Sequence, residues 1–217
     1  MELGIPIFPR VNGKEEKSIK HYSSNQKILL VGEGDFSFAA CLATAFGSAE
    51  NMVATSLDSK ELLMIKHQTA SDNLEKLEGL GCTILHEVDA KTMSHDPRLV
   101  SKLFDRIVFN FPHAGFTLRE HDAYQIELHQ NVVKGFLRSA HHMLEKDGEI
   151  HITHKTAYPF NKWEIKKLAE EVGLCLVDEI GFSRYHYPGY VNKRGDGSRS
   201  DCTFPVGECS TFRFAKP

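Results

Sequence analysis

The sequence lacks any apolar run that approaches the roughly 18 to 20 residues needed to span a bilayer, so no membrane-spanning helix is expected. Its N-terminus also lacks the apolar stretch of a secretory signal. Cysteine is scarce, with five residues among 217, and no two of them form a C-x-x-C pair. This usage excludes a disulfide-stapled miniprotein and fits a reduced, intracellular chain with one large domain.

The sequence has no excess of positive charge, because 29 acidic residues outnumber 26 basic ones and leave a net charge of −3. A protein that coats nucleic acid is usually basic, so any contact with nucleic acid is expected to be local or shared with a partner. The 12 histidines include no H-E-x-x-H or similar ligand pattern. We therefore predict no metal site.

From Lys27 onward the sequence alternates between short apolar runs and longer amphipathic segments. This alternation predicts an α/β fold: an open, Rossmann-like, mostly parallel sheet with helices on both faces. The last two strands lack a helix between them and can run antiparallel. The expected strands are 28–31, 52–57, 82–88, 106–109, 149–154, 174–180 and 210–214, and the expected helices are 37–46, 59–80, 97–104, 123–144 and 161–172.

The first 26 residues differ from the rest, because they lack apolar periodicity and carry several glycines, prolines and mixed charges. We expect residues 1–26 to be a flexible tail and residues 27–217 to be the folded domain. In a sheet of this kind, ligands bind beyond the carboxyl ends of the strands, near the point where the strand order reverses. The residues that follow each strand are therefore the candidates for chemistry.

A glycine-containing loop follows the first predicted strand. Its residues are Gly32, Glu33, Gly34, Asp35, Phe36 and Ser37. The two glycines let the backbone turn sharply and approach a ligand, and the amides that open the next helix can bind it. The two carboxylates would repel a pyrophosphate but suit an amino group and a sulfonium, which favours S-adenosylmethionine over NAD. We assign all six residues to cofactor binding, with a purely structural glycine turn as the alternative.

Carboxylates also follow the second and third predicted strands. Asp58, which is followed by Ser59, can accept the hydroxyl protons of an adenosine ribose. Asp89 can accept a proton from the adenine amino group, and Ala90 can supply backbone groups. We assign these four residues to the cofactor, although a helix N-cap at Asp58 and an ordinary loop aspartate at Asp89 are simpler alternatives.

The fourth predicted strand leads into the most specific segment of the chain, Asn110, Phe111, Pro112 and His113. Methyltransferases that act on planar ring nitrogens often carry Asn or Asp, Pro and an aromatic residue at this strand end. An amide can bond to a ring nitrogen, proline stiffens the turn, and an aromatic ring can stack on a flat base. We predict that these four residues form the catalytic segment and that Asn110 also contacts the cofactor. Candidate proton acceptors are Asn110, His113 and Asp35.

The segment between the last two predicted strands, about 182–207, interleaves aromatic and basic residues. Stacking rings together with basic phosphate contacts are typical of proteins that hold single-stranded or extruded bases. A polar loop whose aromatic residues pack on the sheet is the alternative. We predict substrate contacts from Tyr187, Tyr190 and Arg194 in this segment, and from Arg119 and Lys155 beyond the fourth and fifth strands.

Three stretches, 31–38 (VGEGDFSF), 110–115 (NFPHAG) and 187–190 (YPGY), resemble the eukaryotic family of ribosomal-RNA uracil-N3 methyltransferases. The resemblance covers roughly residues 27–214. It implies a class I S-adenosylmethionine-dependent methyltransferase with a seven-stranded sheet whose last strand is antiparallel. It also implies methylation of uridine N3 in large-subunit rRNA and a nucleolar setting. We further expect rRNA, with pre-ribosomal proteins, as the partner, and a monomer located in the nucleolus or cytoplasm.

Other functions stay open on the sequence alone. A non-catalytic assembly factor with the same fold would bind RNA or protein without turnover. A nicotinamide-dependent oxidoreductase is disfavoured by the acidic loop and by Ser37 in place of a third glycine. A small-molecule methyltransferase would show no dependence on RNA.

Overall fold

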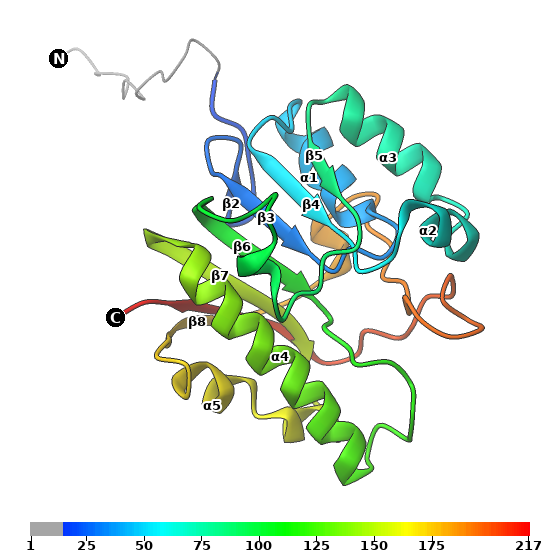
Figure 1. Ribbon diagram of the computed structural model, residues 1–217, viewed down its shortest axis with the longest axis vertical. Helices are drawn as coiled ribbons and strands as arrows, with labels where there is room; N and C mark the ends of the chain where they lie inside the picture. The colour runs from blue at the N-terminus through cyan, green and yellow to red at the C-terminus, as the bar shows by residue number, and fades with distance from the viewer. Residues whose placement is uncertain (1–14) are drawn as a thin grey trace, which may run out of the picture.

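The computed structural model describes residues 15–217, which contain a seven-stranded sheet covered by helices (Figure 1). The strands of this sheet are β3 (Ile28–Val31), β4 (Met52–Thr55), β5 (Thr83–Leu85), β6 (Phe104–Asn110), β7 (Leu144–Lys155), β8 (Cys175–Gly181) and β9 (Cys209–Ala215). They lie in the order β5-β4-β3-β6-β7-β9-β8. β9 pairs antiparallel with both β7 and β8, while the other neighbouring strands pair in parallel. The predicted α/β fold with an antiparallel last strand is confirmed.

The helices form two layers because the buried strands carry apolar side chains on both faces. The α-helices are α1 (Ser37–Phe46), α2 (Lys60–Lys66), α3 (Ala70–Gly79), α4 (Ala123–Met143) and α5 (Ile165–Glu170), and short 3-10 turns are η1 (Met93–His95), η2 (Phe160–Trp163) and η3 (Arg184–His186). Alternate residues of β3 point to opposite faces of the sheet. Ile28 and Leu30 pack into a core with α1 and α3, whereas Leu29 and Val31 pack into a second core with α4 and α5.

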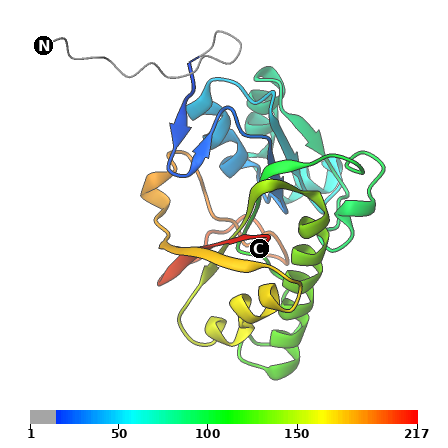
Figure 2. The same ribbon diagram turned by 90° about the vertical axis from the view of Figure 1, so that its left-hand side faces the viewer.

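The prediction of a flexible tail over 1–26 is wrong for residues 18–23, which are part of the fold. Residues 1–14 lie outside the described residues, but β1 (Ser18–Ile19) and β2 (Tyr22–Ser23) form an antiparallel hairpin. Tyr22 is buried, with its ring 6.0 Å from Phe38 and its hydroxyl 3.1 Å from His151 Nδ1. The hairpin lies beside the segment that follows β8 (Figure 2). Tyr22, together with the Ile19 side chain and the His21 ring, therefore attaches this polar segment to the domain.

The prediction of one continuous helix over 59–80 is wrong, because this stretch forms two helices, α2 and α3. The break occurs at His67, which has an extended backbone and a buried ring whose Nδ1 lies 3.3 Å from Asp201 Oδ1. This tertiary contact outweighs the helical pattern of the sequence. The predicted helix 97–104 is also absent from the described residues, which form turns over 97–101.

The strand order reverses between β3 and β6. The chain first adds β4 and β5 on one side of β3, and then places β6 against the other side of β3. In parallel sheets this switch point leaves a crevice beyond the strand ends. None of the helices in 15–217 is long and apolar enough to cross a membrane. The fold thus places an opening at the ends of β3, β4 and β6.

Candidate active site

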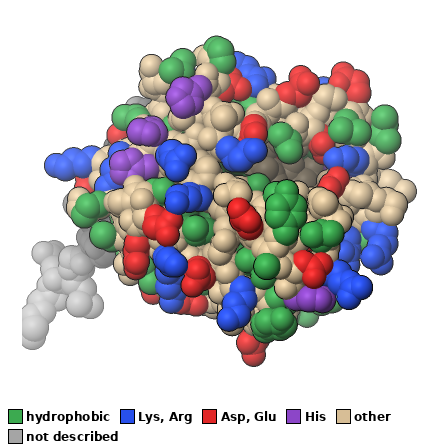
Figure 3. Space-filling view, turned by 60° about the horizontal axis from the view of Figure 1, so that its bottom comes forward, with side chains coloured by type: hydrophobic (Ala, Val, Ile, Leu, Met, Phe, Trp, Pro, Cys, Tyr) green, Lys and Arg blue, Asp and Glu red, His purple; other side chains and the backbone are tan. Residues whose placement is uncertain are grey.

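A cavity of about 800 Å³ opens at these strand ends. It brings together eight residues that the sequence analysis assigned to the cofactor: Gly32, Glu33, Gly34, Asp35, Asp58, Asp89, Ala90 and Asn110. The face shown in Figure 3 is hollowed, and Lys and Arg side chains stand among acidic ones around the hollow. The surface charge is therefore mixed, which agrees with the small net charge of the chain.

Gly32 begins the loop after β3 and has a φ of +66°, a conformation that disfavours residues with a side chain. A Cβ at this position would lie 2.4 Å from Phe109 Cε2 on the neighbouring strand. The cavity floor at this point is therefore bare backbone. Phe36, by contrast, is fully buried, and Ser37 begins α1 and bonds to Val191, so these two assigned residues do not line the cavity.

The two carboxylates of the loop bond to the chain itself. Glu33 Oε2 accepts from the backbone amide of Ala39 at 3.1 Å, and Asp35 accepts from the Ser37 amide and the Thr69 hydroxyl, both at 3.0 Å. Burial raises the pKa of Glu33 to about 8, and the nearby Asp35 adds to the increase, although the Ala39 amide opposes it. Glu33 is therefore largely protonated at neutral pH, and the loop carries less negative charge than its sequence suggests.

Asp58 lies at the cavity wall beyond β4, where Lys66 Nζ donates to both of its carboxylate oxygens at 2.8 and 3.0 Å. Ser59 instead caps α2, because its hydroxyl accepts from the Leu62 amide. Asp89 Oδ1 accepts from the Lys91 backbone amide at 2.9 Å, and its Oδ2 lies 3.5 Å from the Lys91 ammonium. A ligand ribose at Asp58 would thus share this carboxylate with a lysine that the sequence analysis did not identify.

Asn110 ends β6 with an unusual amide group. Both its Oδ1 and its Nδ2 are buried and have no hydrogen-bond partner among the described residues. Leaving such a group unpaired costs about 1 to 3 kcal/mol, so the Asn110 amide is available to bond with a ligand or with water. Phe111 and His113 line the same cavity, while Pro112 is buried behind it. Asn110 is therefore a free donor and a free acceptor at the place where the sequence analysis predicted the reaction.

His113 contributes to a partly buried cluster with Glu120 and His129. His113 Nε2 lies 2.8 Å from Glu120 Oε1, and His129 Nε2 lies 3.2 Å from Glu120 Oε2. Two imidazoles and a carboxylate are a common metal-ligand set, and three of their donor atoms lie within 4.8 Å of one another. The sequence analysis missed this group because its spacing matches no known ligand pattern.

The protons of the cluster can be assigned from its backbone contacts. Each Nδ1 accepts an amide proton, that of His113 from Gly115 at 3.0 Å and that of His129 from Ala114 at 3.1 Å. In a neutral His113 the proton must then sit on Nε2, which faces Glu120. The Nε2 of His129 lies 3.2 Å from Glu120 Oε2 and 3.1 Å from the Gln125 side-chain Nε2. Burial alone would raise the pKa of Glu120, but its contacts with the two histidines hold it well below its usual range. A metal ion at His113 Nε2 would have to displace this proton, whereas the hydrogen bonds from the Ala114 and Gly115 amides to the two rings fix the loop after β6.

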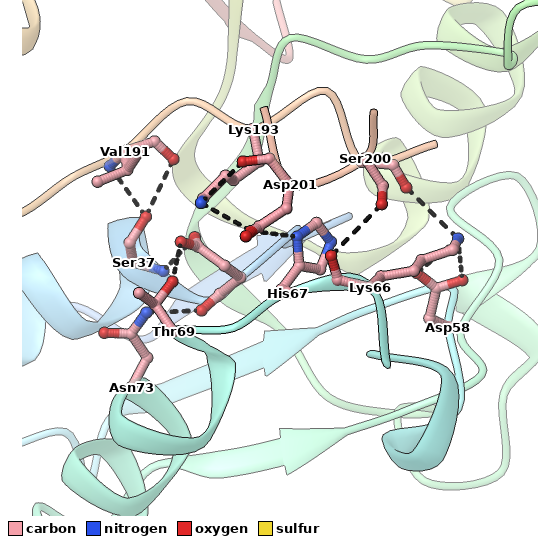
Figure 4. A network of polar contacts seen from close by, with 12 residues as sticks. Ser37, Asp58, Lys66, His67, Thr69, Asn73, Val191, Lys193, Ser200 and Asp201 are labelled. Atoms are coloured by element: carbon pink, nitrogen blue, oxygen red, sulfur yellow. Dashed lines mark hydrogen bonds and ion pairs between the residues drawn. The ribbon is translucent and has the colours of Figure 1, made fainter. Parts of the chain in front are cut away.

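The segment after β8 lies across the residues that join α2 to α3 (Figure 4). Lys193 Nζ donates to Asp201 Oδ1 at 2.7 Å, and Asp201 also contacts His67. The Lys66 ammonium lies 3.4 Å from the Gly195 carbonyl oxygen. These contacts tie residues 193–201 to the break between α2 and α3, and no sequence pattern signalled them.

The five predicted substrate residues have different environments. Tyr190 and Arg194 line the cavity, Arg119 is exposed on the loop after β6, and the Lys155 ammonium lies 5.0 Å from the ring centroid of Phe204. Tyr187 contradicts its assignment, because it is only 3% exposed. Its ring packs against Tyr22, Phe38 and Phe182, so it is part of the core rather than of a substrate surface.

Comparison with known proteins assigns the sequence to a family. The model of the BMT5-like family, described as rRNA (uridine-N3-)-methyltransferase BTM5-like, matches residues 29–194. An uncharacterized Arabidopsis thaliana protein is 59% identical over 204 residues, which cover 93% of this chain and 98% of that protein. The heavy metal-associated isoprenylated plant protein 41 of A. thaliana is 50% identical over 94% of this chain, but the match spans only 39% of that longer protein.

More distant proteins share the fold. The Saccharomyces cerevisiae 25S rRNA (uridine(2634)-N(3))-methyltransferase is 25% identical over 93% of this chain and 74% of its own length. A methyltransferase structure from Pyrococcus furiosus superposes with a TM-score of 0.53 and 16% identity, over 87% of this chain and 74% of that one. At this identity the structural likeness supports the methyltransferase fold alone.

Proposed function

Because the chain belongs to the BMT5-like family, we propose that it is an S-adenosylmethionine-dependent methyltransferase that acts on N3 of a uridine in large-subunit rRNA. The observation that carries this proposal is the unpartnered Asn110 amide at the end of β6, which shares its cavity with the glycine loop and Asp58. We propose rRNA, accompanied by pre-ribosomal proteins, as the partner, with the chain acting as a monomer in the nucleolus or cytoplasm.

The cavity has features that suit this cofactor. The bare backbone at Gly32 permits close approach of a ligand, and Asp58 offers carboxylate oxygens to ribose hydroxyls. Asp89 and Ala90 line the part of the cavity assigned to adenine. When bound, S-adenosylmethionine supplies an electrophilic methyl group, and the protein must mainly align the acceptor nitrogen with it.

Uracil N3 carries a proton and two flanking carbonyl groups, so the site must favour its anion. The Asn110 Nδ2 group can donate to a uracil carbonyl oxygen, which stabilises the negative charge that spreads from N3 onto that oxygen. The other two candidates for proton acceptor are less available. His113 has both ring nitrogens engaged, and Asp35 is 3% exposed and accepts two hydrogen bonds.

We therefore propose that Asn110 binds and polarises the base and that the N3 proton passes to solvent. The side-chain Oδ1 of Asn110 then remains free to accept a hydrogen bond from an amino or ribose group of a ligand. Phe111 and His113 border the base, with Phe111 held by the rings of Phe182 and Phe204 at 5.7 and 5.2 Å.

The test combines binding and turnover. Wild-type protein should bind S-adenosylmethionine in a calorimetric titration and transfer a labelled methyl group to large-subunit rRNA. Asn110→Ala should lower turnover by about 100-fold, in the range for loss of an electrostatic donor, while cofactor affinity falls by much less than turnover. Tight cofactor binding by the wild type without transfer to any RNA would instead support a non-catalytic assembly factor.

A further inference from the structure

A second cavity of about 470 Å³ lies next to the active site, between the residues that follow β8 and those that precede β9. Its walls include Phe182, Arg184 and Tyr185 on one side and Phe204 and Pro205 on the other. None of these residues lines the active-site cavity. The two cavities are therefore distinct parts of the same strand-end surface.

One aromatic ring separates the two cavities. Phe111 lines the active site, and its ring lies 5.2 Å from that of Phe204 and 5.7 Å from that of Phe182 in edge-on contacts. A planar group in the second cavity would thus lie one ring away from a base held at Asn110. This spacing suits two neighbouring units of one polymer.

The walls of the second cavity have the chemistry of a base-stacking site. Tyr185 is 95% exposed, which is unusual for so large an aromatic side chain. The Lys155 ammonium lies outside the lining, 5.0 Å from the ring centroid of Phe204. Arg184 lines the cavity, and its guanidinium donates to Asn192 Oδ1 at 2.9 Å. Exposed rings beside cationic side chains hold unpaired nucleotides through stacking and phosphate contacts.

We propose that this cavity is a second nucleobase site, which holds an unpaired nucleotide that flanks the target uridine. The proposal rests on the proposed function, because it assumes that RNA reaches the active site. Tyr185 supplies the outer stacking surface and Phe204 the inner one, while Arg184 and Lys155 neutralise the adjoining phosphates. The site would help to draw the target base out of its neighbours' stack by giving one neighbour a new stacking partner.

The experiment uses a short single-stranded RNA with one uridine and 2-aminopurine, a base whose fluorescence falls on stacking. Two probes carry this base on the 5′ or the 3′ side of the uridine, so that either strand direction is tested. The wild type should quench one of them. Tyr185→Ala should abolish the quenching and weaken RNA binding by about tenfold, within the range for loss of one stacked base.

Three comparisons make the result specific. Tyr185→Phe should retain quenching and affinity, because it keeps the ring. Tyr124→Ala, which removes an exposed tyrosine from the start of α4 outside the cavity, should behave as the wild type. All variants should bind S-adenosylmethionine equally, since none of these tyrosines lines the cofactor cavity.

The outcomes separate the two proposals. Quenching that depends on Tyr185, without methyl transfer, would support the base site and overturn the proposed reaction. Methyl transfer with RNA affinity and quenching unchanged in Tyr185→Ala would overturn the base site and leave the reaction intact. Absence of RNA binding by the wild type would overturn both.

Discussion

Replacing Glu33 with glutamine should change how the stability of the protein depends on pH. Glu33 is buried, and burial raises its pKa to about 8 from an ordinary value near 4.5. A carboxyl group whose pKa is raised by folding binds its proton more tightly in the folded state. Its contribution to stability is therefore complete below pH 4.5 or so and is lost as the pH rises toward 8.

The size of the effect follows from these two pKa values. Between about pH 5.5 and about pH 8, ionisation of this one group should lower the free energy of unfolding by about 3 kcal/mol. Glutamine carries no charge, yet its amide oxygen can still accept the hydrogen bond from the Ala39 amide at the start of α1. The variant should thus keep the fold and lose this part of the pH dependence.

Urea unfolding of both proteins at these two pH values measures the difference directly. The wild type should lose stability on going to the higher pH by about 3 kcal/mol more than Glu33→Gln does. Contributions from all other titrating groups cancel in this comparison. Equal pH dependence of the two proteins would refute the argument and would mean that Glu33 titrates like an exposed carboxyl.

Two further substitutions test the cofactor side of the cavity. Asp58→Ala should weaken S-adenosylmethionine binding about tenfold or more in calorimetry, because a charged acceptor for the ribose is lost, whereas Asp72→Ala on the exposed side of α3 should have no effect. Gly32→Ala should lower the free energy of unfolding by at least about 2 kcal/mol, since it combines a positive φ with a contact to Phe109. Gly173→Ala shares the positive φ but meets open space, so a smaller loss there isolates the contact with Phe109, and an equal loss would contradict it.

The sequence was a good guide to the centre of the sheet, because β3 and β4 are short runs in which all four residues are buried. The same logic placed Asp58, Asp89 and Asn110 at neighbouring strand ends, and the structure brings them to one cavity. These predictions depended on local pattern and on the general geometry of parallel sheets.

The features that were missed depend on contacts between segments far apart in the chain. Tyr22 lies in a polar stretch without periodicity, and only its packing on Phe38 and Tyr187 shows that the hairpin belongs to the fold. Lys66 reaches Asp58 because α2 ends where His67 turns inward, which a helical pattern over 59–80 does not indicate. Tyr187 seemed suited to stacking on a base, but aromatic residues fit a core equally well.

The most direct test of the central proposal is nucleoside mass spectrometry of large-subunit rRNA incubated with S-adenosylmethionine and the purified protein. The account predicts 3-methyluridine in the wild-type reaction and a loss of about 100-fold in its rate of formation with Asn110→Ala, at saturating cofactor. A methyl group on another base or on a ribose, or the absence of any methylation of the RNA, would contradict the proposed role of Asn110 and the proposed reaction.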